Sequence, residues 1–269
     1  MNKHTQIVAV SNQKGGVGKT TTVVNLATAL AHYKQKVLVI DLDPQANATS
    51  GLGVVPQEGI SLYRAMVDAS IMDTIVTDSV IKNVWLIPAE LGMAGAEIEI
   101  ARMPDHLFCI RKLLQPVAES GQYDFILLDC PPSLGILMSN ALAAADSVLI
   151  PMQCEYYALE GLSVITHLVQ SMKANGSNPK LELNGILMTM FDNRTKLAEE
   201  VMGQVQQHYG AAVYSTTIPR NVRVSEAPSY GMPVIAYDPT SRGAEAYMAF
   251  GKEFLARTTA KRVKDQGVM

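Results

Sequence analysis

A short segment near the amino terminus combines glycines, lysines and threonines in an order suited to holding phosphate. It reads Ser11-Asn12-Gln13-Lys14-Gly15-Gly16-Val17-Gly18-Lys19-Thr20-Thr21 and lies between a short apolar run and a stretch with helical spacing. The glycines let successive backbone N–H groups face phosphate oxygens, and the start of the following helix adds partial positive charge. Lys19 would reach the β- and γ-phosphates, the Thr20 hydroxyl would lie on Mg²⁺, and Thr21 would meet the α-phosphate. Residues 14–21 therefore predict a nucleotide site.

This segment departs from the ordinary phosphate loop at two neighbouring positions. The pattern G-x-x-x-x-G-K-[ST] requires glycine at position 13, where this chain has Gln13, and the next residue is a second lysine, Lys14. The strand pattern, the loop, the Lys-Thr pair and the helical pattern still coincide, which a chance glycine-rich turn would not produce. The nucleotide prediction therefore stands, and Lys14 needs an explanation of its own.

Two other apolar runs end in carboxylates. Residues 37–40 are followed by Asp41 and Asp43, and residues 125–128 are followed directly by Asp129. Because ligands of open α/β sheets bind at the carboxyl ends of strands, we expect these acids beside the phosphate loop. Asp129 is predicted to hold Mg²⁺ through a water molecule. Asp41 lies on the same side of an extended strand as Asp43, and predicts either a supporting Mg²⁺ contact or a loop contact.

The elements that would position these side chains alternate along the chain. Short apolar runs predict strands over residues 7–10, 37–40, 84–87, 125–128, 148–150 and 186–190. Helical spacing fills residues 20–33, 93–103, 107–118, 134–145, 159–174, 197–209 and 244–256. This alternation predicts an α/β fold with a doubly wound, mostly parallel β-sheet flanked by helices. We expect a single domain over residues 1–256 and a basic, flexible tail over residues 257–269.

Charge and composition exclude several classes of protein. The 22 basic and 25 acidic residues of this 269-residue chain give a net charge of −3, which disfavours a strongly basic nucleic-acid binder but not a local basic face. Three cysteines without a C-x-x-C pair argue against a disulfide framework and a zinc ribbon. A signal-peptide pattern and an apolar run of ~18 residues are both missing, so a cytoplasmic protein is expected.

Residues 14–20, Lys-Gly-Gly-Val-Gly-Lys-Thr, resemble the deviant Walker A loop of the ParA/MinD ATPases, a P-loop NTPase family. The resemblance implies ATP and Mg²⁺ as ligands, with hydrolysis that is slow and stimulated by a partner. It implies that Lys14 reaches across a homodimer to the phosphates of the partner's ATP, which would couple nucleotide state to dimerisation. It also implies that Asp43 orients the attacking water. Lys14, Lys19 and Asp43 are therefore the predicted catalytic residues.

Longer segments resemble the ParA/Soj class in particular. They are residues 41–53, 188–195, 218–228 and 237–245, and the resemblance extends over about residues 5–256. The class implies chromosome or plasmid partitioning by a protein that binds DNA non-specifically, associates with the nucleoid in its ATP state and works with a ParB-type centromere-binding protein. It implies that Arg194, Arg220 and Arg223 contact DNA phosphates. It also implies that Pro219 and Asn221 lie near the adenine.

Other members of the superfamily are weighed against this interpretation. Residues 254–263 hold too few large apolar side chains for the interfacial helix of a MinD-type protein, so no stable membrane anchor is expected. The last tyrosines, Tyr237 and Tyr247, form no cluster of the kind a bacterial tyrosine kinase carries. A single phosphate loop does not match a tandem anion pump. The alternative that remains is a MinD-like or other ParA-like ATPase that positions a membrane or protein cargo.

Overall fold

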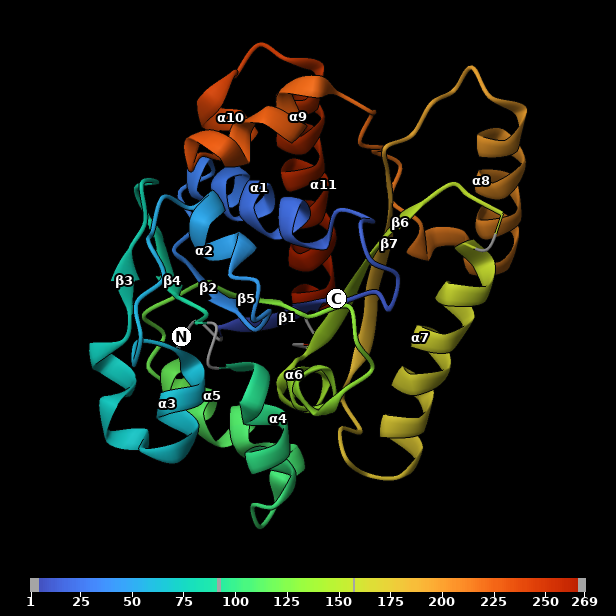
Figure 1. The fold of residues 1–269 in the computed structure, drawn as a ribbon. Helices are drawn as coiled ribbons and strands as arrows, with labels where there is room; N and C mark the ends of the chain where they lie inside the picture. The colour runs from blue at the N-terminus through green and yellow to red at the C-terminus, as the bar shows by residue number, and fades with distance from the viewer. Residues whose placement is uncertain (1–4, 91–92, 157, 266–269) are drawn as a thin grey trace.

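The computed structural model describes residues 5–90, 93–156 and 158–265. Within them a seven-stranded sheet has the order β3-β4-β2-β5-β1-β6-β7 (Figure 1). The strands are β1 (Gln6–Val10), β2 (Val37–Asp41), β3 (Thr77–Asp78), β4 (Val84–Ile87), β5 (Phe125–Asp129), β6 (Ser147–Gln153) and β7 (Glu182–Thr189). Every neighbouring pair is parallel except β3 with β4. The predicted doubly wound, mostly parallel sheet is confirmed.

Helices connect the strands and cover both faces of the sheet. They are α1 (Lys19–His32), α2 (Asn47–Gly51), α3 (Leu62–Val67), α4 (Met93–Ala101), α5 (Cys109–Glu119), α6 (Ile136–Ala144), α7 (Ala158–Ala174), α8 (Lys196–Tyr209), α9 (Val222–Glu226), α10 (Val234–Tyr237) and α11 (Arg242–Asp265). Short 3₁₀ turns are η1 (Ala69–Thr74), η2 (His106–Phe108), η3 (Gly210–Ala212) and η4 (Ala227–Tyr230). Of the helices described, none combines the length and hydrophobicity needed to span a bilayer.

The central strands are buried on both faces. Successive residues of β1, β2 and β5 alternate between two apolar clusters, as the period of two in an extended strand requires. One cluster packs under α3, α5, α6, α7 and α8, and the other packs under α1, α2, α10 and α11. Figure 1 shows α1, α10 and α11 on one side of the sheet and α3 to α6 on the opposite side. This packing holds the carboxyl ends of the central strands in fixed relative positions.

The last helix extends beyond the predicted domain boundary. A flexible tail was expected from residue 257, whereas α11 continues to Asp265. The Arg257 guanidinium lies 4.0 Å over the centre of the Tyr214 ring and donates to the carbonyls of Ala211 and Val213. These contacts let a charged residue pack against the protein where the apolar pattern of the helix ends. Residues 257–265 therefore belong to α11 where a flexible tail was expected, and residues 266–269 lie outside the described residues.

Glu253 ties α11 to the segment that follows η3. Its carboxylate accepts hydrogen bonds from the backbone N–H groups of Ser215 and Thr216, both at 2.9 Å, and from the Thr216 hydroxyl at 2.7 Å. Burial alone would raise the pKa of Glu253, but these hydrogen bonds outweigh it and lower the pKa to about 2. The ionised carboxylate is thus favoured in the folded protein.

We expect Glu253→Gln to lower the free energy of unfolding by about 1–3 kcal/mol at pH 7, because charge-assisted hydrogen bonds are lost. The folded pKa of about 2 lies below the ordinary value of 4.5, so the stabilisation is complete above pH 4.5 and disappears as pH falls toward 2. Urea unfolding of both proteins between pH 7 and pH 2.5 measures this difference. Glu119→Gln, at an exposed glutamate of α5, is the charge-matched control. A destabilisation independent of pH would contradict the assignment.

Candidate nucleotide site

The phosphate loop joins β1 to α1 in a conformation that requires glycine at two positions. Gly16 has φ +74° and Gly18, which immediately precedes α1, has φ +85°. Both values lie in the left-handed region that side chains with a Cβ rarely adopt. A Cβ built on Gly16 would meet no atom within 4 Å, so the requirement comes from the backbone and not from crowding. The open side of the loop is available to a ligand.

The side chain of Asn12 holds the start of the loop. Its Oδ1 accepts a hydrogen bond from the Lys14 N–H at 3.0 Å, and its Nδ2 donates to the Pro151 carbonyl of β6 at 2.8 Å. Asn12 is 3% exposed, so its side-chain amide is buried. The loop is thereby attached to a neighbouring parallel strand.

The middle of the loop is attached to the carboxyl ends of β6 and β7. The Thr189 hydroxyl donates to the Val17 carbonyl at 2.7 Å, and the Gln153 amide donates to the Gly16 carbonyl at 3.0 Å. Both donors bind carbonyls, so neither contact occupies an N–H group that could face an anion. Neither residue was singled out in the sequence, although Gln153 ends β6 and Thr189 ends β7.

Lys19 is a nearly buried cation at the first position of α1. It is 7% exposed, and its Nζ donates to the Lys14 carbonyl at 3.1 Å. Burial lowers the pKa of Lys19, whereas the negative charges of Asp129 and Asp43 oppose that shift. The ammonium group thus interacts electrostatically with both predicted acids.

Asp129 is the final residue of β5 and is fully buried. Neither carboxylate oxygen has a hydrogen-bond partner of normal geometry within the described part of the chain. Burial raises the pKa of Asp129 well above its ordinary value, and the charge of Asp41 adds to this; the Thr20 hydroxyl and the Lys19 ammonium act in the opposite direction. Such an unsatisfied buried carboxylate is costly unless a ligand completes its contacts.

The donor set at Asp129 fits a hydrated Mg²⁺. Across the described residues no three His, Cys, Asp or Glu side chains gather as a ready metal cluster. Mg²⁺ does not need one, because it keeps several waters and takes one or two carboxylates together with phosphate oxygens. A carboxylate beside a threonine hydroxyl and a phosphate loop matches that requirement.

Asp41 is engaged in a loop contact, one of its two predicted roles. Its Oδ2 accepts hydrogen bonds from the Thr49 N–H at 2.8 Å and hydroxyl at 2.7 Å, and its Oδ1 accepts from the Asp43 N–H at 3.1 Å. Burial raises the pKa of Asp41 to about 6, while these hydrogen bonds act to lower it. Asp41 therefore shapes the loop between β2 and α2, and its Mg²⁺ contact stays a prediction.

Asp43 lies in that loop as a half-buried carboxylate. Its Oδ1 accepts a hydrogen bond from the Gln45 N–H at 3.0 Å. Its charge reaches Lys19, where it opposes the lowering of the lysine pKa. The Asp43 carboxylate is therefore near Lys19 and is held at one oxygen, and its role at a nucleotide stays a prediction.

Lys14 carries the second cation of the loop at its surface. Its side chain is 41% exposed, and its Nζ forms an ion pair with Glu155, which follows β6. Glu155 was not singled out in the sequence, because nothing local distinguishes it from other surface glutamates. The ammonium of Lys14 is therefore held at the surface, whereas Lys19 is nearly buried.

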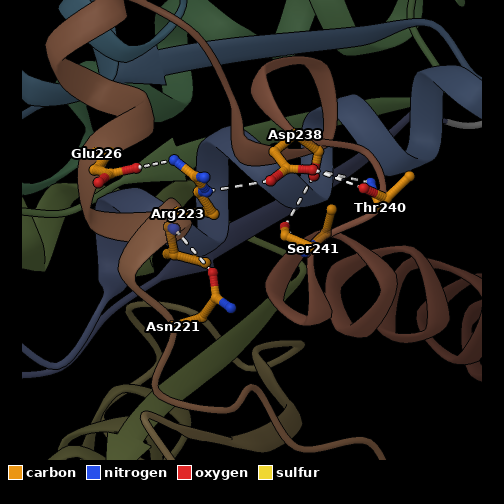
Figure 2. Close-up of polar contacts among 8 residues, drawn as sticks. Asn221, Arg223, Glu226, Asp238, Thr240 and Ser241 are labelled. Atoms are coloured by element: carbon orange, nitrogen blue, oxygen red, sulfur yellow. Dashed lines mark hydrogen bonds and ion pairs between the residues drawn. The ribbon is translucent and has the colours of Figure 1, made fainter.

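The predicted DNA contacts are exposed arginines near the carboxyl end of the sheet. Arg194 pairs with Asp192, and Arg223 pairs with Glu226 and Asp238 (Figure 2). Hydrogen bonds from Arg194 hold the pKa of Asp192 at about 2, and the charge of Arg220 adds to this effect. The structure thus brings Arg194 and Arg220 to one carboxylate and gives Arg223 separate partners.

The two predicted adenine contacts lie in the segment that leads into α9. Pro219 pairs with Phe191 just beyond β7, and Asn221 accepts a hydrogen bond from the Val224 N–H at 3.3 Å to cap α9. Asn221 is therefore the N-cap residue of α9. Its proximity to a base stays a prediction.

The chain resembles known proteins over most of its length. The family described as AAA domain matches residues 5–183. The chain is 47% identical to the chromosome partitioning protein ParA of Myxococcus xanthus over 95% of this chain and 90% of that protein. It is 48% identical to the sporulation initiation inhibitor protein Soj of Bacillus subtilis over 93% of this chain and 98% of that protein.

A solved structure agrees with the fold over nearly the whole chain. Cobyrinic acid a,c-diamide synthase from Mycobacterium smegmatis, with a bound ATP analogue and magnesium, matches with a TM-score of 0.82 and 31% identity. The match covers 96% of this chain and 97% of that one. The deviant phosphate loop and the identity to ParA and Soj proteins lead to one conclusion. The chain belongs to the ParA/Soj family, within the ParA/MinD group of P-loop proteins.

Proposed function

We propose that this protein is a Mg²⁺-dependent ATPase whose ATP-bound homodimer binds DNA without sequence preference. We propose further that it acts in chromosome or plasmid partitioning with a ParB-type centromere-binding protein. The observation that carries the proposal is the buried, unsatisfied carboxylate of Asp129 between Lys19 and the Thr20 hydroxyl. The names of its ParA and Soj relatives support the partitioning role.

The nucleotide site uses backbone and side-chain groups of residues 14–21. The N–H groups of Gly15, Gly16, Val17 and Gly18 face the phosphates, and Lys19 neutralises their charge. Thr21 takes the α-phosphate, while the Thr20 hydroxyl and, through water, Asp129 hold Mg²⁺. When bound, Mg²⁺ neutralises the charge that develops on the phosphate oxygens. Pro219 and Asn221 border the adenine.

Hydrolysis requires a group that orients water against the γ-phosphate. We assign this role to Asp43, because its half-buried carboxylate is held at Oδ1 by the Gln45 N–H and faces Lys19. Lys14 completes the site across the dimer, since its exposed ammonium can leave Glu155 and reach a facing protomer. Nucleotide and dimer state then depend on each other, as linkage requires.

DNA binding rests on exposed arginines that the dimer presents twice. Arg194, Arg220 and Arg223 are exposed, and a guanidinium binds phosphate regardless of sequence. Two linked sets of weak contacts bind DNA far more tightly than one set. The DNA affinity is therefore high only when ATP holds the dimer together. The apolar side of α11 packs under α1 and is not free to enter a bilayer, which favours DNA over a membrane surface. Association with the nucleoid in the ATP state follows.

Lys19→Ala should weaken binding of a fluorescent ATP analogue by at least about tenfold, the loss expected for a charged hydrogen-bond donor. A titration followed by fluorescence anisotropy measures it. Lys173→Ala, at an exposed lysine of α7, should bind as the unaltered protein does. Circular dichroism verifies that both variants fold. Tight binding by folded Lys19→Ala would remove the phosphate-loop assignment.

Asp43→Ala should retain ATP binding and lose about 100-fold or more of the hydrolysis rate, because positioned water contributes that much. The ATP-bound dimer should then persist in size-exclusion chromatography with light scattering. Phosphate release in the same samples gives the rate. If Asp43→Ala hydrolyses ATP as fast as the unaltered protein, Asp43 does not orient the water.

Co-sedimentation with DNA and with anionic liposomes separates this function from its alternative. We expect the protein to sediment with DNA in ATP but not in ADP, and to remain in solution with liposomes. Arg220→Glu should lose DNA and keep ATP-dependent dimerisation, because it reverses one phosphate contact. Sedimentation with liposomes would instead indicate a MinD-like ATPase. Binding to neither would indicate a ParA-like ATPase for a protein cargo.

A further inference from the structure

Two of the three arginines proposed to contact DNA are already bound to carboxylates of their own chain. Arg194 donates from Nε to Asp192 Oδ1 at 2.8 Å and from Nη2 to Asp192 Oδ2 at 2.7 Å. This pair of parallel bonds is the bidentate arrangement that a guanidinium also makes with phosphate. Asp192 therefore occupies the donors that a DNA phosphate would use.

Arg223 lies between two carboxylates, as Figure 2 shows. Its Nη1 donates to Glu226 Oε2 at 2.8 Å, and its Nε lies 3.3 Å from Asp238 Oδ2. Asp238 is held in place because its Oδ1 also accepts from the Thr240 hydroxyl at 2.9 Å. The guanidinium is thus engaged from its own helix and from the turn before α11.

Arg220 differs from these two arginines. It is exposed, and over the described residues it takes part in no ion pair. Its charge contributes to the low pKa of Asp192, so it lies on the same side of the molecule as the Arg194 pair. Of these three arginines in each protomer, Arg220 is therefore outside an ion pair within the described residues, and Arg194 and Arg223 are bound to carboxylates.

Protonation of Asp192 does not free Arg194 near neutral pH. Hydrogen bonds from Arg194 hold the pKa of Asp192 at about 2, so this carboxylate is ionised near neutral pH. Only another anion of matching geometry can take its place. A DNA phosphate is such an anion.

We infer that Asp192, Glu226 and Asp238 limit DNA affinity by competing with phosphates for the guanidinium groups of Arg194 and Arg223. This inference rests on the proposed DNA binding. Arg220 makes the first contact, and the other arginines join only after a phosphate displaces a carboxylate. Because each displacement returns little net energy, one protomer binds DNA weakly and two protomers are needed.

A carboxylate beside an arginine can also raise DNA affinity. A carboxylate that orients an arginine toward DNA would strengthen binding, and its removal would weaken it. A carboxylate that merely adds negative charge would weaken binding even without the arginine. Neutral variants and a double-mutant cycle distinguish all three cases.

The test measures binding of a fluorescein-labelled 60-base-pair DNA of arbitrary sequence by anisotropy in ATP and Mg²⁺. Glu226→Gln and Asp192→Asn keep the length of each side chain, and the amide oxygen of Asp192→Asn can still accept from the Arg194 N–H. Each should tighten binding roughly two- to fivefold, the range that couplings of exposed ion pairs imply. Asp238 is left unchanged because it also holds Thr240.

The cycle repeats each neutral variant without its arginine. The gain from Glu226→Gln should vanish in Arg223→Ala, and the gain from Asp192→Asn should vanish in Arg194→Ala. A gain that persists, or weaker binding by the neutral variants, would overturn the inference. Glu119→Gln controls for the change in net charge and should leave affinity unchanged. If the unaltered protein and all variants fail to bind DNA in ATP, the proposed function itself fails.

Discussion

The structure depends on a buried charge arrangement at the carboxyl ends of its central strands. Asp129 and Asp41 lie side by side in the register of β5 and β2, and Lys19, at the start of α1, interacts electrostatically with Asp129. Burial opposes ionisation of all three groups, so the arrangement is costly without a phosphate and a cation to complete it. A phosphate and a cation that bind here would compensate these buried charges, and their binding would stabilise the folded protein.

Sheet order explains how three distant segments reach this point. The β5 strand lies between β1 and β2, so the loop after β1 and the acids that end β2 and β5 meet at one edge. The outer strands β6 and β7 add the amide and hydroxyl groups that hold the loop's carbonyls. Position in the sheet, and not proximity in sequence, therefore gives each side chain its role.

Much of this could be predicted from the sequence because the signals were strong and local. The β2 and β5 runs are apolar throughout, as strands covered on both faces must be, and Lys19 ends a loop of characteristic spacing. The short helices α2, α9 and α10 were missed because four or five residues are too few to show a helical period. Asn12 and Thr189 were missed for another reason, since their contacts join residues more than a hundred positions apart.

The net charge of −3 and the arginine ion pairs both limit how strongly the protein attracts phosphate. A strongly basic surface would hold DNA in every nucleotide state, because phosphate affinity grows with each free cation. Carboxylates such as Asp192 and Glu226, placed two or three residues from an arginine, occupy its donors and reduce the net gain when a phosphate displaces them. Affinity then depends on how many arginines act together, which is what a dimer assembled by nucleotide would control. Under the proposed function, near-neutral charge and nucleotide-controlled DNA binding are thus two aspects of one electrostatic balance.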